Sequence, residues 1–157
     1  MASNSLQQQI ASMRQSFFDE GILGDEFIEL ENLETDTNPN FVTDVTKIYF
    51  FKSPGVIRAI EQALETYPEK LDFLLQKFKE SSRRIGAKKV LIEANKIVQE
   101  NNEGSRTALQ NMKQEYNTLK DKLEAYLELV RQAKLFFLGK RQAKLAQSSF
   151  PPSEGSD

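Results

Sequence analysis

The segment from Leu71 to Ala87, LDFLLQKFKESSRRIGA, has the clearest helical pattern on which a fold prediction can be based. On a helix, residues three, four or seven positions apart lie on the same side. With this spacing, an apolar face contains Leu71, Leu74, Leu75, Phe78 and Ile85. A second face, the polar face, contains Gln76, Lys79, Glu80 and Arg83. The segment therefore predicts a helix with one side in a core and the other side on the surface.

Both ends of this helix carry boundary signals. Pro68 disfavours helical geometry at Tyr67, so we expect the helix to start there. Gly86 suits the left-handed conformation that commonly follows the last residue of a helix. The predicted helix therefore runs from about Pro68 to Gly86.

Three helices are predicted before this one. The first carries the four-three-four spacing of Leu6, Ile10, Met13 and Phe17 and ends near Gly21. Asp25 is placed to cap a short second helix that carries Phe27, Leu30 and Leu33. Asn38 and Pro39 predict the start of a third helix, because an asparagine cap followed by proline is a common helix start. Ser53, Pro54 and Gly55 leave open whether this is one kinked helix or two.

Two helices are predicted after it. Val90, Leu91, Ala94, Ile97 and Val98 describe a helix up to the turn-like NNEGS at Asn101 to Ser105. The last helix has apolar residues at alternating steps of three and four, namely Leu109, Met112, Tyr116, Leu119, Leu123, Tyr126, Val130, Ala133 and Phe137. A helix from Ser105 to Leu138 would be about 50 Å long. Its end is therefore expected either to pair with the first helix or to project.

These elements define the fold class and the domain organisation. No strand-like alternation, internal repeat or glycine-rich phosphate loop is present in the sequence. We predict an all-α protein, an up-down four-helix bundle with additional short helices at the N-terminus. Residues 1–146 are expected to form one helical domain, and residues 147–157, QSSFPPSEGSD, a disordered tail.

The composition limits the chemistry. The 157 residues include no cysteine and no histidine, which removes thiolate catalysis, the usual general base at neutral pH and the usual transition-metal ligands. No spacing of carboxylates singles out an acid/base pair or a metal site. We therefore expect no enzyme, no metal and no cofactor. An enzyme that uses carboxylates would require a perturbed pair in a closed pocket.

Membrane contact and a secreted location are also disfavoured. No apolar run is long enough to span a bilayer, and the polar start MASNSLQQQ differs from a signal peptide. In AKLFFLGKRQAKLA, we expect the aromatic residues to cap the bundle rather than to enter a membrane. The sequence predicts a soluble intracellular protein. Its tyrosines, Tyr49, Tyr67, Tyr116 and Tyr126, are expected in the core or at its boundary.

The polar face is locally basic. Between Gln76 and Lys89, a single acid, Glu80, stands among the basic residues Lys77, Lys79, Arg83, Arg84, Lys88 and Lys89. One interpretation is a solvated surface on which Glu80 pairs with Arg84. The other is a binding site for an acidic protein. Nucleic acid fits less well, because the net charge of -2 is not basic and no exposed aromatics are expected among these charges.

From about Leu23 to Gln132, the sequence closely resembles the plant histidine phosphotransfer (HPt) proteins of multistep phosphorelays. The resemblance rests on the segments DEFIELENLETDTNPNFV, ESSRRIGAKKV and MKQEYNTLKDKLE. The family signature is a phospho-accepting histidine followed by lysine three, glycine four, serine six and glycine ten residues later. This chain has Gln76, Lys79, Glu80, Ser82 and Gly86 at those positions. Three positions match, and the two departures include the phosphoryl acceptor.

The resemblance implies a pseudo-phosphotransfer protein without catalytic activity. Its expected partners are the receiver domains of response regulators and hybrid histidine kinases, which it would occupy to damp a relay, most plausibly in cytokinin signalling in the cytoplasm and nucleus. The expected partner-binding residues are Gln76, Lys79, Glu80, Ser82, Arg83 and Arg84. A helical scaffold for an unrelated partner is the alternative. We expect a monomer, although the spacing of the last helix could also serve a second chain.

Overall fold

Residues 2–149 fold into six helices. The computed structural model describes residues 2–149, and the side chains of residues 5–139. The helices are α1 (Ala2–Asp19), α2 (Asp25–Asn32), α3 (Phe41–Thr66), α4 (Pro68–Ile85), α5 (Lys88–Ala94) and α6 (Glu103–Ser149). The described residues contain no strand, only the isolated bridges Leu23 with Ala87 and Thr35 with Asn38. The all-α prediction is confirmed.

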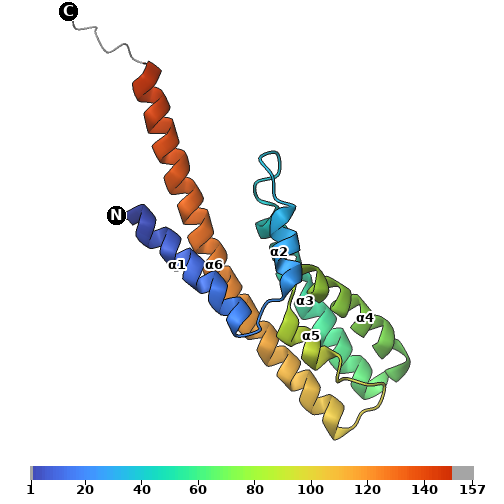
Figure 1. The fold of residues 1–157 in the computed structure, drawn as a ribbon. Coiled ribbons are helices and arrows are strands. Elements are labelled where there is room, and N and C mark those ends of the chain that lie inside the picture. Colours follow the sequence, from blue (N-terminus) through green and yellow to red (C-terminus); the bar gives the residue numbers. More distant parts are fainter. Residues whose placement is uncertain (1, 150–157) are drawn as a thin grey trace, which may run out of the picture.

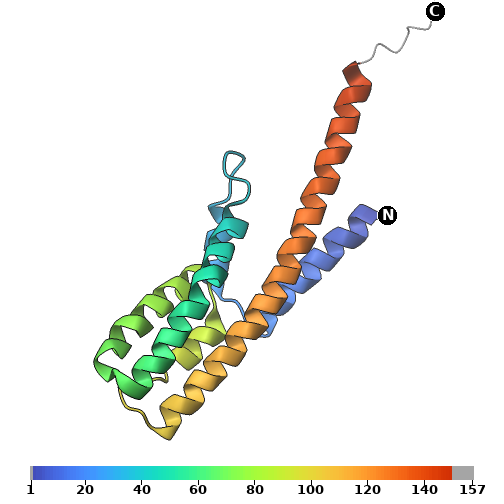
Figure 2. The ribbon, with the colours of Figure 1, turned by 180° about the vertical axis from the view of Figure 1, so that it is seen from behind.

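Four helices build the up-down bundle. Helix α3 packs against α4 and α6, and α5 packs against α4 and α6 (Figure 1). Helix α1 lies along α6, and α2 packs on α4 and α3. Seen from behind, the second half of α6 runs on past the bundle, with α1 beside it (Figure 2). The two outcomes predicted for the long helix both occur, because α6 pairs with α1 and its C-terminal end also projects from the bundle.

An aromatic cluster forms the centre of the bundle. The Tyr49 ring stacks on Phe78 at 6.3 Å between centroids and lies 5.8 Å from Tyr116, which lies 5.9 Å from Phe50. Tyr49, Tyr116 and Tyr126 are buried, as predicted for tyrosines of the core. Tyr67, at the α3–α4 turn, is 47% exposed and belongs to the boundary. The core thus joins α3, α4 and α6 through large side chains.

Helix α3 starts later than predicted. Thr35 and Asn38 exchange backbone hydrogen bonds in a turn, so neither Asn38 nor Pro39 begins the helix. The first helical residue is Phe41, and the Glu34 carboxylate accepts a hydrogen bond from the Val42 amide at 3.1 Å. A side chain from before the turn therefore satisfies one of the first amides of the helix, which is the role that a capping residue normally has.

Helix α3 continues through Pro54 as one helix. Proline has no N–H, so the carbonyl of Phe50, four residues earlier, loses its normal helical donor. The hydroxyl of Tyr116 on α6 donates to this carbonyl at 3.3 Å. A neighbouring helix therefore supplies the hydrogen bond that the proline removes, which accounts for an uninterrupted helix where the sequence left two possibilities.

Three other boundaries also differ from the predictions. Asp25 is the first residue of α2, and Gly24 occupies the cap position. Helix α5 ends at Ala94 rather than beyond Val98, because the Val98 amide donates to the Ser105 hydroxyl at 3.1 Å and not to a helical carbonyl. Helix α6 begins at Glu103, where the Asn102 side chain accepts from the Ser105 amide at 2.8 Å and caps the first turn.

The C-terminal boundary was also misplaced. Helix α6 extends to Ser149, so residues 147–149 of the predicted tail are helical, and residues 150–157 lie outside the described residues. Four apolar residues near the end of the helix are exposed rather than capping the bundle, namely Leu135, Phe136, Phe137 and Leu138. In the part of the chain that the structure describes, no helix is long and apolar enough to cross a membrane.

Candidate docking surface on helix α4

Helix α4 is held in a fixed orientation by its C-terminal end. Gly86 has φ of 75°, a left-handed conformation that favours glycine, and a Cβ at this position would lie 2.7 Å from the amide nitrogen of Phe27. The Gly24 amide donates to the Gly86 carbonyl at 2.9 Å, and the Lys88 amide donates to the Ile22 carbonyl at 3.2 Å. The segment before α2 therefore ties down the end of α4 and fixes which residues face solvent.

Most of the predicted polar face lies on the surface. Gln76, Glu80, Arg83 and Arg84 are exposed, and Lys79 is half-buried. Four of the five predicted apolar residues are buried, whereas Leu74 is only half-buried. The structure thus brings five of the six predicted partner-binding residues onto one accessible side of α4, and their role in binding stays a prediction.

The sixth residue, Ser82, is not part of this surface, and its assignment to partner binding is wrong. Its exposed fraction is 0%, and its hydroxyl is hydrogen-bonded to the Tyr49 hydroxyl at 2.7 Å. Ser82 lies four residues after Phe78 and seven after Leu75, so helical spacing already placed it on the core face. Burial raises the pKa of Tyr49 well above its usual value, so the phenol remains a neutral hydrogen-bond partner.

A groove between α2 and α4 adjoins the polar face. It measures about 490 Å³ and is lined by Glu26, Glu29, Leu30, Leu33, Glu80, Arg83 and Arg84. Within the described residues, no ion pair joins Glu80 to Arg84, so the internal pairing considered from the sequence is absent. The carboxylate of Glu80 and the two guanidinium groups instead face a hollow that solvent or a partner can enter.

An exposed aromatic side chain, Phe73, lies beside Gln76 and was not predicted from the sequence. Phe73 precedes Gln76 by three residues, so the two side chains are neighbours on the helix surface, and Phe73 is 72% exposed. The helical spacing already placed Phe73 outside the apolar face, and this was the signal in the sequence that predicts its exposure. An exposed phenyl ring beside polar groups is typical of the anchors found in protein interfaces.

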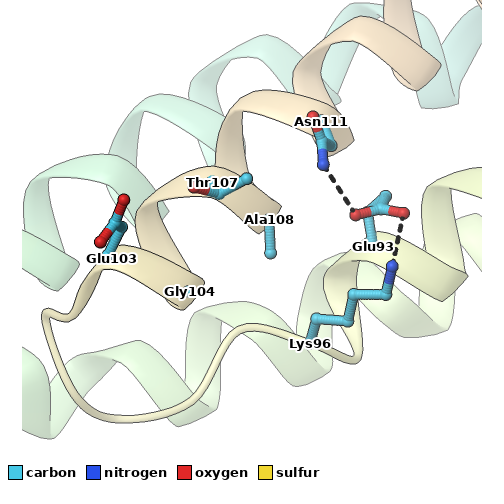
Figure 3. Close-up of a pocket in the computed structure, with 7 residues that line it drawn as sticks. All are labelled: Glu93, Lys96, Glu103, Gly104, Thr107, Ala108 and Asn111. Carbon is cyan, nitrogen blue, oxygen red and sulfur yellow. Dashed lines mark hydrogen bonds and ion pairs between the residues drawn. The ribbon is translucent and has the colours of Figure 1, made fainter.

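A second hollow lies on the other side of the bundle, between α5 and the start of α6 (Figure 3). One of its two carboxylates, Glu93, accepts hydrogen bonds from Lys96 at 3.0 Å and from Asn111 at 3.4 Å. Among the described residues, no group of three or more side chains is placed to hold a metal ion. The polar face of α4 is therefore the stronger candidate site, and it offers surface recognition without a nucleophile.

Comparison with known proteins defines the class of this bundle. A histidine-containing phosphotransfer protein of Medicago truncatula, MtHPt2, superposes with a TM-score of 0.74 at 29% identity, covering 83% of this chain and 93% of that one. A putative histidine-containing phosphotransfer protein from rice gives a TM-score of 0.76 at 26% identity, covering 85% and 99%. The fold is that of a phosphotransfer bundle. No family model matches the chain.

Curated relatives supply the family. Pseudo histidine-containing phosphotransfer protein 2 of Oryza sativa subsp. japonica is 40% identical over 139 residues, which are 84% of this chain and 92% of the relative. Histidine-containing phosphotransfer protein 4 of Arabidopsis thaliana is 40% identical over 116 residues, 69% of this chain and 91% of the relative. The chain belongs to the plant histidine-containing phosphotransfer family, which includes pseudo members, and the resemblance found in the sequence is confirmed.

Proposed function

We propose that this protein is a non-catalytic member of its family that binds receiver domains of response regulators or hybrid histidine kinases and damps a His-Asp phosphorelay. The pathway we propose is cytokinin signalling, with the protein acting as a negative regulator in the cytoplasm and nucleus. The observation that carries the proposal is Gln76, exposed at the acceptor position on a helix whose surrounding surface has Lys79 and the exposed Phe73.

Gln76 accounts for the missing chemistry. Phosphoryl transfer through histidine needs an imidazole nitrogen that attacks phosphorus and then releases the group. The side-chain amide of Gln76 can donate and accept hydrogen bonds, but its nitrogen lone pair is delocalised, and it cannot carry the phosphoryl group. The exposed Glu80 one turn later adds a negative charge that opposes an incoming phosphate. Both the acceptor and the space around it are altered.

Binding does not require the missing histidine. Receiver domains carry acidic clefts, and Lys79, Arg83 and Arg84 offer the opposite charge, which favours encounter and orientation. Phe73 adds an apolar contact next to these charges. A protein that occupies the receiver without passing on a phosphoryl group lowers the flux through active relatives.

Phosphoryl transfer tests the first half of the proposal. The protein is incubated with a phosphorylated receiver domain that carries a radioactive phosphoryl group. We expect no stable label on the wild type or on Gln76→His, and label on the double variant Gln76→His/Glu80→Gly. Stable label on the wild type would overturn the non-catalytic assignment, and equal label on the single and double variants would show that Glu80 is not an obstacle.

Titration against a panel of receiver domains tests the second half. We expect Lys79→Glu to weaken binding about tenfold through lost charge complementarity. Lys47→Glu, which reverses an exposed lysine on α3, is the matched control and should bind as the wild type does. Absence of binding to every receiver at high micromolar concentration would refute the proposal, and capture of mainly unrelated proteins would favour a scaffold instead. Fluorescence microscopy of the tagged protein tests the two compartments.

A further inference from the structure

The outer side of α3 carries two exposed apolar side chains. Phe51 is 86% exposed and Ile48 is 55% exposed. They are three residues apart in the sequence, so they lie next to each other on the helix surface. Seen from behind, α3 runs between α4 and α6, and no other helix of the described residues crosses its outer side (Figure 2). Helix α3 therefore presents an apolar pair to solvent.

Basic side chains border this apolar pair. Lys52 lies on one side of it, and Lys47 and Arg58 lie on the other, because successive residues of a helix point in directions about 100° apart. All three are exposed, and none of them forms an ion pair within the described residues. Residues 44–60 contain these three basic residues and one acid, Asp44, so this part of α3 has a formal charge of +2 in a chain whose net charge is -2.

Gly55 lies one turn after Phe51 on the same side of the helix. Glycine is less favourable than alanine inside a helix, and the described structure gives no reason for one here. The φ of Gly55 is not left-handed, and a Cβ at this position would meet only Arg58, whose Nη2 lies 3.9 Å away, an ordinary contact. The missing side chain leaves a flat place beside the apolar pair, where the backbone of a second chain can approach closely. The α3 patch consists of Lys47, Ile48, Phe51, Lys52, Gly55 and Arg58.

We propose that the α3 patch binds an acidic amphipathic helix of another protein. The apolar side of that helix packs on Ile48 and Phe51, its backbone approaches Gly55, and its carboxylates meet the basic residues at the two edges of the patch. The surface from residue 47 to residue 58 is about 16 Å long, which matches about three turns of a partner helix. The patch lies on α3 and the predicted receiver-binding surface lies on α4, so this inference does not depend on the proposed function.

Other occupants fit the α3 patch less well. A second copy of this chain would bring the three basic residues of the patch against themselves, and like charges that meet across an interface oppose binding. Nucleic acid is bound through many phosphate contacts, whereas the patch offers three cations on a chain with a net charge of -2. An anionic membrane makes no use of Gly55, because a lipid surface has no backbone that must approach closely.

Two designed peptides test the charge requirement. Each forms an amphipathic helix of about four turns with leucines on one side; the first peptide has glutamates on both flanks of the leucines, and the second has lysines there. Fluorescence anisotropy of the labelled peptides with the full chain should give a micromolar dissociation constant for the glutamate peptide, weaker at high salt, and no binding of the lysine peptide. Equal binding of the two peptides, or binding of neither, would overturn the proposal.

Substitutions locate the site at which the glutamate peptide binds. Phe51→Ser should weaken binding at least tenfold because it removes an apolar anchor, and Ile92→Ser, at an exposed apolar residue on α5, is its control. Lys52→Glu should weaken binding about tenfold, and Lys77→Glu, which reverses an exposed lysine on α4, is the matched control. Because all four side chains are exposed, circular dichroism should report folded protein for every variant. Equal effects of Lys52→Glu and Lys77→Glu would place the peptide elsewhere and overturn the proposal.

Gly55→Ala separates binding from folding. Alanine favours the helix, so the melting temperature should not fall, whereas the added methyl group should weaken binding of the glutamate peptide several-fold because it holds the second helix away. Binding that is unchanged by Gly55→Ala would overturn the proposal. Anionic phospholipid vesicles or single-stranded DNA that bind the chain more tightly than the glutamate peptide, and that no longer bind Phe51→Ser, would also overturn it.

Discussion

The hydrogen bond between Tyr116 and the carbonyl of Phe50 predicts a specific coupling with Pro54. In the native chain, Tyr116→Phe removes the hydroxyl that serves this carbonyl, which has no normal helical donor because residue 54 is proline. Leaving a buried carbonyl unsatisfied costs about 1–3 kcal/mol, and the 3.3 Å distance favours the lower half of that range. We expect Tyr116→Phe to lower the free energy of unfolding by about 1–2 kcal/mol.

In a Pro54→Ala background, the same change should cost much less. Alanine restores an N–H four residues after Phe50, so the carbonyl regains a helical donor and no longer depends on the tyrosine. The two costs should differ by about 1 kcal/mol, which a double-mutant cycle resolves. Urea unfolding of the four proteins, followed by circular dichroism, measures each free energy.

Tyr126→Phe is the control for this cycle, because Tyr126 is also buried on α6 but donates no hydrogen bond to a helical carbonyl within the described residues. Its cost should be the same with and without Pro54→Ala. If Tyr116→Phe also costs the same in both backgrounds, the tyrosine does not compensate for the proline and our account of the uninterrupted helix is wrong.

Three further predictions concern the core and the contact of Gly86, at the end of α4, with the start of α2. Ser82→Ala should lower the free energy of unfolding in urea by about 1–3 kcal/mol, because it leaves the Tyr49 hydroxyl buried without its hydrogen-bond partner. The double variant Tyr49→Phe/Ser82→Ala should recover part of that loss, and a double variant whose cost equals the sum of the two single costs would contradict this. Gly86→Ala should lower the free energy of unfolding by about 2 kcal/mol or more, because alanine disfavours the left-handed φ at this position and its Cβ would clash with the Phe27 amide nitrogen. An unchanged melting temperature would contradict the proposed constraint at the end of α4. Burial raises the pKa of Tyr116 and of Tyr126 to about 12, so the stability these phenols contribute is complete below their unfolded pKa of about 10 and is lost as the pH rises from there to 12. Unfolding measured from pH 8 to 12 should show this loss, and phenolate absorbance near pH 10 in a folded Tyr67→Phe variant, which keeps only the three buried tyrosines, would contradict it.

The bundle was predictable from the sequence where local signals act alone. Pro68 and Gly86 delimit α4 as expected, because each acts through its own backbone geometry. The long apolar seam of α6 likewise predicted its packing against other helices. These signals depend on a residue and its near neighbours in sequence, and at these positions no distant group overrides them.

Predictions failed where a distant group supplied a hydrogen bond. Helix α3 starts later than predicted because the Glu34 carboxylate accepts a hydrogen bond from the Val42 amide across a turn. Helix α5 ends earlier than predicted because the Val98 amide donates to the Ser105 hydroxyl of α6. Neither contact has a signal in the local sequence. The continuity of α3 at Pro54 also depends on another helix, so the sequence alone could not decide between one helix and two.

Exposure was the other source of error. Phe73 and residues 135–138 are apolar, and an apolar residue is normally assigned to a core, yet these side chains are 39–72% exposed in the described chain. Ser82 shows the opposite case, a polar residue that the family signature drew to the surface although its spacing placed it inside. Which side chains remain uncovered depends on how all six helices pack.

The burial of Ser82 changes what the matched signature positions say about this chain. Of the three signature positions that this chain keeps, Ser82 is held by a core hydrogen bond and Gly86 by its backbone conformation. Both residues therefore have a structural role in this chain that does not depend on phosphoryl transfer. Lys79 is the one matched position that solvent reaches, so the number of matches to the signature overstates how much of a phosphotransfer surface this chain has.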